Sequence, residues 1–422
     1  MLLLPKLGIS GVGSLSSSRI TYGALHYLPP TEELIRRFCR YLSSLGASVK
    51  VMTKSVEGRD IYLIRVGEGR LKALVIAGIH GNEPAPISAS LALTYVLAKK
   101  SPPNPYFDIK YLIKEVTTYV VTPLNPDGLS RYLSGNYWEV PNWSSSCEEG
   151  RVNANYVDLN RDWVLLTQPE TLGAHRVIEE LDPHLVIDLH EFHAKGGSPP
   201  KWGYETEGFM ISLTDSPYGW VNDCVKSVSN ELMIDVSKYL RTVFSGWVIK
   251  SRHFLGGTEG VESVVWAPPN YLGTHVSIEG RPKLLIETWG IGLGKYLYPD
   301  RVAIHVHACL EALTYLADHG GKFVRAKEEH VREDLSRYGL RGKYVISGED
   351  TQLTRKVLKE HGIDVVSKGN ELIIELPQYR GRNKLANILL NPDCEFNVEL
   401  RRRLRGPYTL DRLINVEVRV KA

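Results

Sequence analysis

Residues 74–84 read Leu-Val-Ile-Ala-Gly-Ile-His-Gly-Asn-Glu-Pro, and the interpretation of the chain starts from this stretch. An apolar, β-prone run ends in two glycines that bracket a histidine, His80. Glycine lets the backbone take turn conformations that a side chain would obstruct. Glu83 follows three residues after His80, so the turn can direct an imidazole nitrogen and a carboxylate oxygen at one metal ion. We therefore predict a buried strand at 71–77 that leads into two metal ligands.

Strand-like and helix-like segments alternate along most of the chain. Short apolar, β-rich runs predict strands at 49–53, 60–66, 71–77, 116–121, 184–189 and 283–286. Apolar residues at helical spacing predict helices at 34–45, 84–99, 169–181, 218–243 and 301–316. Between these segments, 125–128 is predicted to be a turn and 268–282 a loop. The alternation predicts an α/β fold in which helices cover both faces of a mixed, mostly parallel central sheet.

Composition excludes several classes of function. The formal net charge of +3 is too small to indicate binding to nucleic acid or to an anionic membrane. A membrane-spanning helix needs about 20 apolar residues in a row, and the sequence contains no such run. The five cysteines are scattered and form no Cys-x-x-Cys pair, which favours a reducing compartment. The apolar start breaks at Pro5, so no signal peptide is expected and we predict a cytoplasmic protein.

A third metal ligand and a catalytic base can be chosen from strand ends. His190 follows an apolar strand, at the edge where open α/β sheets bind ligands. It lies too far along the chain from Glu83 to share one helix with it, so the fold must bring the ligands together. Glu287 also ends a short apolar run, and a carboxylate there suits a general base. Side chains that could orient the imidazoles from behind are Asp158, Asp188, Glu191 and His193.

Five motifs stand in a fixed order along the chain. They are His80-x-x-Glu83, the Asn-Pro-Asp-Gly of 125–128, the Val-Asp-Leu-Asn-Arg of 157–161, the strand-end His190, and the Glu-Thr of 287–288. Together they resemble the zinc carboxypeptidases of the carboxypeptidase A type, over about residues 30–320. The resemblance implies one zinc ion (Zn2+) per chain bound by His80, Glu83 and His190. It also implies that Glu287 is the general base and acid.

The resemblance assigns further residues around the metal. Asp158 would orient the imidazole of His80. Asn160 and Arg161 would bind the free C-terminal carboxylate of a peptide, because a guanidinium can donate two parallel hydrogen bonds to a carboxylate. Arg151 matches the arginine that polarises the scissile carbonyl and stabilises its oxyanion.

Two regions depart from the simplest members of the family. Tyr271 is the nearest match to the substrate-capping tyrosine, and no residue can be assigned to the specificity pocket. Arg281-Pro282 together with the Glu-Thr of 287–288 resembles a microbial subgroup that often carries a C-terminal extension. We therefore expect an N-terminal segment at 1–29, a zinc carboxypeptidase-like catalytic domain at 30–324, and a small C-terminal α/β domain or extension at 325–422. Within the extension, strands are expected at 343–346, 363–366 and 371–376 and a helix at 351–361, followed by the segment 380–390.

Three functions fit these motifs. The first is a metallocarboxypeptidase acting on peptides with a free C-terminal carboxylate. The second is a zinc deacylase of the aspartoacylase and succinylglutamate desuccinylase type, whose substrates are N-acyl amino acids with a free carboxylate. The third is a non-enzymatic metal-binding protein of the same fold. The 125–128 motif and the aromatic-rich loop after it favour a peptide groove, and the presence of both Glu287 and Arg161 disfavours a binding module.

Overall fold

A computed structural model of the chain defines the fold. It describes residues 22–139, 149–193, 211–214, 221–246, 249–252, 255–256, 263–264, 268–339, 341–379, 381–398 and 409–421. Most of the expected N-terminal segment (1–21) and part of the aromatic-rich loop (140–148) lie outside the described residues.

The centre of the molecule is a mixed eight-stranded sheet. Its strands, in spatial order, are β1 (Ser48–Lys54), β2 (Asp60–Val66), β4 (Val116–Thr122), β3 (Leu71–Ala77), β5 (Leu185–His193), β10 (Lys283–Ile291), β6 (Ile211–Thr214) and β7 (Ile249–Arg252). The four central strands, β4, β3, β5 and β10, run parallel to one another. Strands β3 and β5 are almost entirely buried, as expected for parallel strands covered on both faces. The predicted mixed, mostly parallel sheet is confirmed.

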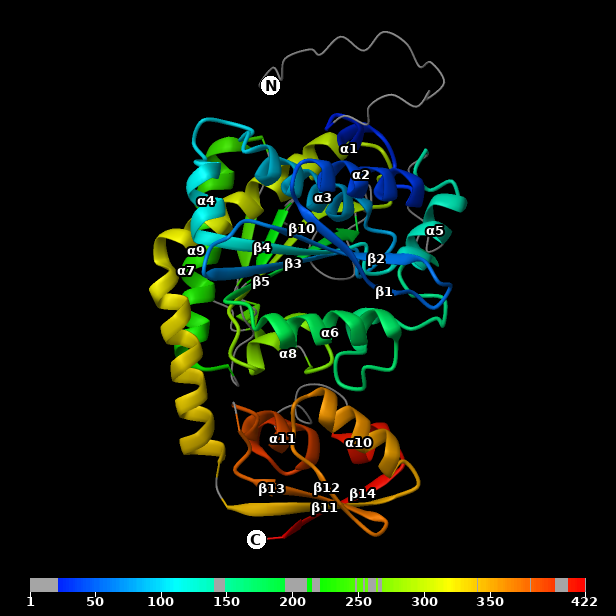
Figure 1. Cartoon of the computed structure of the whole chain (residues 1–422), viewed down its shortest axis with the longest axis vertical. Helices are drawn as coiled ribbons and strands as arrows, with labels where there is room; N and C mark the ends of the chain where they lie inside the picture. Colours follow the sequence, from blue (N-terminus) through cyan, green and yellow to red (C-terminus); the bar gives the residue numbers. More distant parts are fainter. Residues whose placement is uncertain are drawn as a thin grey trace.

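Helices cover both faces of this sheet. They are α1 (Ala24–Tyr27), α2 (Glu32–Ser44), α3 (Pro84–Lys99), α4 (Ile109–Glu115), α5 (Pro126–Ser134), α6 (Pro169–Leu181), α7 (Asp223–Val243), α8 (Leu272–Ile278) and α9 (Tyr298–Glu333). Figure 1 shows α2 and α3 on one side of the sheet and α6 and α8 on the other. Local signals set several of the boundaries. The Thr31 side chain caps α2 by accepting a hydrogen bond from the Leu34 nitrogen, and a proline occupies the first turn of α3 and of α6.

Two predicted irregular segments are helical instead. The motif at 125–128 was predicted to be a turn, but Asn125 caps helix α5 by accepting a hydrogen bond from the Gly128 nitrogen. Pro126 suits the first turn of that helix, where its missing N–H is not needed. The predicted loop at 268–282 contains α8, whose first N–H groups include that of Leu272, bonded to the Asn160 side chain. A cap supplied from so distant a residue leaves no local sequence signal.

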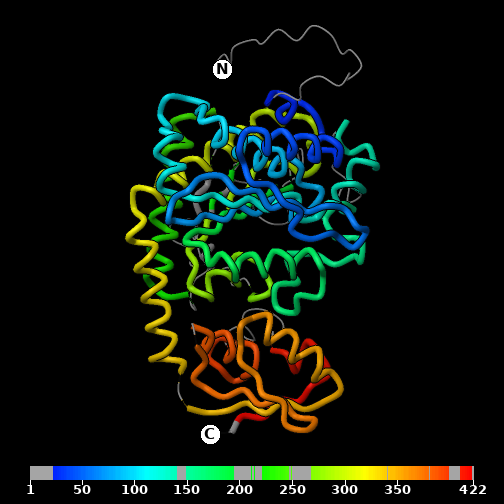
Figure 2. Tube along the Cα trace, in the orientation of Figure 1, coloured from blue at the N-terminus to red at the C-terminus, as the bar shows by residue number. Residues whose placement is uncertain are grey.

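The C-terminal region forms a second, antiparallel sheet with its own helices. Its elements are β11 (Gly342–Gly348), α10 (Thr351–Glu360), β12 (Val366–Lys368), β13 (Glu371–Leu376), α11 (Asn383–Leu390), α13 (Leu410–Leu413) and β14 (Val416–Lys421). The strand expected at 363–366 is wrong, because the β-ladder with β13 begins only at Val366. Helix α9 continues past residue 325 and leads along the side of the molecule to this sheet (Figure 2). The three-part division of the chain stays a prediction.

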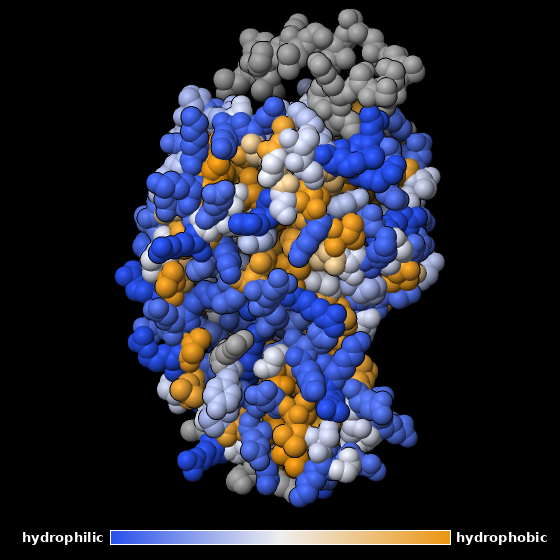
Figure 3. Space-filling view, in the orientation of Figure 1, coloured by the Kyte–Doolittle hydropathy of each residue, from blue (hydrophilic) through white to orange (hydrophobic). Residues whose placement is uncertain are grey.

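Figure 3 shows a surface on which hydrophilic side chains surround small, separate hydrophobic patches. Among the residues that the structure describes, no helix is both long enough and apolar enough to cross a membrane.

Buried ion pairs join the C-terminal region to the rest of the molecule. Arg382 contacts the carboxylates of Glu279 and Glu179, and Arg281 contacts the same two carboxylates. Glu279 is buried, which by itself would raise the pKa of its carboxyl group. The charges of Arg382 and Arg281 outweigh this effect and hold the pKa of Glu279 well below its usual value. The Glu279 carboxylate is therefore ionised, and its negative charge compensates the buried charges of both guanidinium groups.

Replacing Glu279 with Gln is expected to lower the free energy of unfolding by about 3 kcal/mol, because breaking a buried pair leaves the partner charge uncompensated. Urea unfolding followed by circular dichroism measures the change. The matched control is Arg176→Gln, which removes the largely exposed pair with Glu360. An exposed pair contributes at most about 1 kcal/mol, so equal losses in the two variants would contradict the account.

Candidate metal centre

Three side chains from the central sheet converge on one point. His80 follows β3, Glu83 precedes the first turn of α3, and His190 lies on β5. The Nδ1 atom of His80 lies 2.7 Å from Glu83 Oε1, and the Nδ1 atom of His190 lies 2.9 Å from Glu83 Oε2. The candidate ligand atoms of the three residues all lie within 4.8 Å of one another. Two imidazoles and one carboxylate are a ligand set of catalytic zinc sites, so these residues fit zinc.

Each imidazole has a carboxylate behind it. The Nε2 atom of His80 lies 3.1 Å from Asp158 Oδ1, and the Nε2 atom of His190 lies 3.0 Å from Asp188 Oδ1. The hydrogen bond to Asp158 fixes the tautomer of His80 and leaves its Nδ1 lone pair for a metal, whereas Asp188 faces His190 as an ion-pair partner without a hydrogen bond. The structure thus brings Asp158 to its predicted neighbour, His80. It also selects Asp188 for His190 from the candidates that the sequence left open.

The electrostatics of the centre favour charged groups. Burial alone would raise the pKa of the Glu83 carboxyl, but the two histidines lower it well below its usual value. Burial likewise opposes ionisation of Asp158, while His80 and Arg151 lower its pKa. For His190, burial lowers the pKa, and Asp188 and Glu83 raise it well above the usual value. Both carboxylates are therefore ionised and suited to stabilise a cation.

Glu287 lies beside this centre because of the strand register. In the parallel pair of β5 and β10, Glu287 is directly opposite His190. It lies inside β10 rather than at its end, since the strand extends to Ile291. Burial raises the pKa of Glu287, and the nearby His190 opposes that effect. A partly buried carboxylate next to the metal ligands is suited to exchange a proton.

Close backbone packing explains why glycines accompany the metal-binding turn. The Gly81 nitrogen donates a hydrogen bond to the Gly150 oxygen. A Cβ atom at Gly81 would lie 2.0 Å from the Leu129 nitrogen, and one at Gly128 would lie 2.3 Å from the Gly150 oxygen. Neither position can hold a side chain without moving the backbone beside His80. The glycine of the 125–128 motif therefore supports the metal centre sterically.

Asp158 contacts or caps several of the residues predicted to act on the substrate. Arg151 donates hydrogen bonds to Asp158 Oδ2, with its Nε atom at 3.0 Å. Asn160 and Arg161 belong to the short 3₁₀ turn η2 (Leu159–Arg161), which Asp158 caps. The Arg161 guanidinium stacks on the ring of Tyr271, with its Cζ atom 3.7 Å from the ring centroid. Tyr271, the nearest sequence match to the capping tyrosine, thus contacts the candidate carboxylate-binding arginine.

A buried ion pair behind the centre was missed by sequence reasoning. Glu191 follows His190 on β5, pairs with Arg301 at 2.9 Å and accepts a hydrogen bond from the Ala85 nitrogen. Burial raises its pKa to about 7, although Arg301 opposes the shift. Sequence reasoning proposed Glu191 as an orienting group for an imidazole, but alternation along the strand turns it to the opposite face from His190. In the sequence, only the apolar run that precedes Glu191 indicates that this residue is buried.

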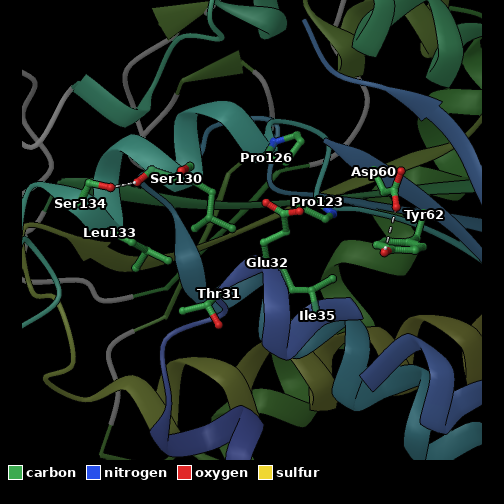
Figure 4. A pocket seen from close by; sticks show the side chains of 11 residues that line it. Thr31, Glu32, Ile35, Asp60, Tyr62, Pro123, Pro126, Ser130, Leu133 and Ser134 are labelled. Atoms are coloured by element: carbon green, nitrogen blue, oxygen red, sulfur yellow. Dashed lines mark hydrogen bonds between the residues drawn. The ribbon is translucent and has the colours of Figure 1, made fainter. Parts of the chain in front are cut away.

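A surface hollow of about 270 Å³ lies away from these groups. Figure 4 shows its lining side chains, which come from α2, β2 and the region of α5 and include Ile35, Tyr62 and Leu133. None of the candidate metal-binding, catalytic or substrate-binding residues lines it. The hollow is therefore not the site described above.

The fold and the centre together define a class: an α/β metalloprotein with a His₂Glu ligand set at the carboxyl ends of parallel strands. Residues 35–182 match the model of the zinc carboxypeptidase family. This segment contains His80 and Glu83, together with the motifs at 125–128 and 157–161. Over residues 35–182 the chain is therefore similar to zinc carboxypeptidases, and His80, Glu83 and His190 form a candidate site for a zinc ion.

Individual relatives are distant. Carboxypeptidase 2 of Trichophyton equinum is 28% identical over 189 residues, which cover 41% of this chain and 30% of the relative. Carboxypeptidase D of Mus musculus is 26% identical over 179 residues, which cover 39% of this chain and 12% of the relative. The chain therefore matches less than a third of the length of either protein. The crystal structure of carboxypeptidase A from Helicoverpa armigera shares the fold, with a TM-score of 0.50 and 13% identity over 74% of this chain and 78% of that one.

Proposed function

We propose that this protein is a zinc metallocarboxypeptidase that removes amino acids from the C-termini of peptides. One observation carries the proposal: a candidate carboxylate-binding group lies next to the metal centre. Asp158 contacts His80 and caps the turn that contains Arg161, and the charge of Arg161 helps to lower the pKa of Asp158. An enzyme that cleaves the last peptide bond needs this combination, since its substrate ends in a carboxylate close to the scissile carbonyl.

The residues of the chain would divide the reaction between them. Bound zinc supplies a Lewis acid and lowers the pKa of a water ligand to about 7. Glu287 would accept the proton of the attacking water and return it to the leaving amine. Burial raises the pKa of the Glu287 carboxyl group. A general base works best when its pKa lies near the working pH, so this shift favours proton transfer near neutral pH.

Two arginines would bind charge on the substrate. Arg161 would hold the C-terminal carboxylate, with the Tyr271 ring keeping the guanidinium oriented. Asn160 uses its side-chain oxygen to accept a hydrogen bond from the Leu272 nitrogen, so its NH₂ group is oriented as a donor. Arg151, which Asp158 holds in place, would stabilise the oxyanion.

The deacylase remains the second candidate, because it would use the same metal ligands and an Asn-Arg pair. The contact of Tyr271 with Arg161 favours the peptidase, since Tyr271 is the nearest match to the family's substrate-capping tyrosine.

One comparison of substrates tests the proposal. The two substrates are a tripeptide with a blocked N-terminus and a free C-terminus, and an N-acetyl amino acid with the same C-terminal residue. Each would be incubated with zinc-loaded protein and with protein stripped of metal by a chelator. We expect hydrolysis of the tripeptide at least tenfold faster, no hydrolysis by the stripped protein, and recovery on adding Zn2+. Faster hydrolysis of the N-acetyl amino acid would favour the deacylase, and chelator-resistant hydrolysis would contradict a metal mechanism.

A further inference from the structure

Three buried histidines meet where the C-terminal region packs against the catalytic region. His175 lies on α6, His275 on α8, and His361 directly follows α10. All three side chains have no exposed surface. Their ring centroids are separated by 5.4 Å (His175 and His275), 4.9 Å (His175 and His361) and 5.1 Å (His275 and His361). Figure 1 shows the helices that carry them facing one another across the junction.

Hydrogen bonds define which imidazole nitrogens are free. The Nε2 atom of His175 lies 2.9 Å from the backbone oxygen of Glu360, and the Nε2 atom of His361 lies 2.8 Å from that of Val164. A carbonyl oxygen only accepts, so both Nε2 atoms carry hydrogen and both Nδ1 atoms carry a lone pair. Neither Nδ1 atom has a hydrogen-bond partner among the described residues, and neither nitrogen of His275 has one.

Such an arrangement is costly for a protein unless something occupies it. A buried polar atom without a partner loses about 1–3 kcal/mol of solvation, and here several lie at one point. Candidate ligand nitrogens of the three residues all lie within 4.8 Å of one another. Histidines that bind metals characteristically donate their other N–H to a backbone carbonyl or a carboxylate, as His175 and His361 do.

The surrounding charges are compatible with a cation. The Glu279 carboxylate lies 3.7 Å from His275 Nε2, which places a negative group beside the cluster. The guanidinium groups that pair with Glu279, those of Arg281 and Arg382, are thereby engaged by a carboxylate.

We propose that His175, His275 and His361 bind a second divalent transition-metal ion, with Zn2+ as the expected occupant. Imidazole nitrogen suits zinc, and three neutral histidines supply three of its usual four ligands. Two ligands belong to α6 and α8, and the third belongs to the C-terminal region. The ion would therefore fasten that region to the catalytic region. This site is distinct from the one formed by His80, Glu83 and His190.

Metal content of full-length variants tests the proposal. After dialysis against buffer that contains a trace of Zn2+ and no other transition metal, the unaltered protein is expected to hold two zinc ions per chain. His80→Ala should hold one, His361→Ala one, and the double variant none. The matched control is His319→Ala, which removes an exposed histidine from α9 and should leave two ions.

Thermal unfolding distinguishes the outcomes further. Adding Zn2+ to metal-stripped His80→Ala should raise its Tm by several degrees, and the same addition to the double variant should not. If His361→Ala fails to fold, the His80→Ala protein still decides the question, because it retains the intact cluster. A folded His80→Ala chain that holds no zinc and shows no Tm shift would overturn the proposal. So would an ion that the folded double variant retains.

Discussion

Replacing Glu287 with Gln is expected to lower kcat by about 10³-fold while the zinc content stays that of the unaltered protein, because a general base typically contributes 10²–10⁴. The amide has nearly the same shape as the carboxylate but cannot accept the proton of the attacking water. Glu287 is not among the three groups whose ligand atoms converge, so its loss should leave the metal bound. Its position opposite His190 on the neighbouring strand gives the expected proximity to the reaction.

Steady-state kinetics and metal analysis on the same preparation check this prediction. The matched control is Glu139→Gln, which removes an exposed carboxylate paired with Lys295 and should leave kcat unchanged. Near-normal turnover in Glu287→Gln would remove the assigned role. Loss of zinc together with activity would instead assign Glu287 to metal binding.

Replacing Arg161 with Ala is expected to lower kcat/KM for peptides with a free C-terminal carboxylate by about 100-fold, since truncating one partner of a desolvated charge pair costs about 2–5 kcal/mol. Most of the change should appear in KM, because the carboxylate contact exists in both the bound substrate and the transition state. Peptides with an amidated C-terminus lack the charge, so their slower hydrolysis should change little.

The comparison of Arg161→Ala with Arg161→Lys sharpens this test. Lysine keeps the charge but loses the planar donor pair and the stacking on Tyr271, so an intermediate loss is expected. Equal losses for free and amidated peptides would contradict a carboxylate-binding role. They would indicate that Arg161 supports the turn beside Asp158 instead.

Much of the fold could be predicted because its signals are local. The helices at 84–99 and 169–181 begin at prolines, and the strand at 71–77 is a continuous apolar run. Helices α5 and α8 were missed for different reasons. The Asn-Pro-Asp-Gly motif has turn-forming residues that also serve as a helix start, and α8 begins beside a side chain from a distant segment, Asn160.

Some residues of the candidate site could likewise be predicted from local patterns, and others could not. His80, Glu83, His190 and Glu287 could be found because each follows or interrupts an apolar strand. The carboxylate behind His190 could be predicted only as one of several candidates, because the sequence does not show which of their side chains face this imidazole. In the structure it is Asp188. The partner of Glu191, Arg301, comes from a different helix, and no sequence pattern links the two.

The three-part division of the chain stays a prediction, and the boundary expected near 325 falls within helix α9. Phe323, Ala326 and His330 form a buried stripe at helical spacing, while the charged residues between them lie mostly toward solvent. Charge density along the sequence therefore cannot by itself locate a domain boundary. The meeting of His175, His275 and His361 could not be predicted either, because it depends on how the C-terminal region packs.

The most direct measurement of the central claim is the mass of the products formed from one peptide in two forms. The peptide would carry either a free or an amidated C-terminus and would be digested by the zinc-loaded protein, with Glu287→Gln as the control. We predict loss of a single residue from the C-terminus of the free form, little or no cleavage of the amidated form, and no product with Glu287→Gln. Internal cleavage, or equal cleavage of both forms, would contradict a metallocarboxypeptidase.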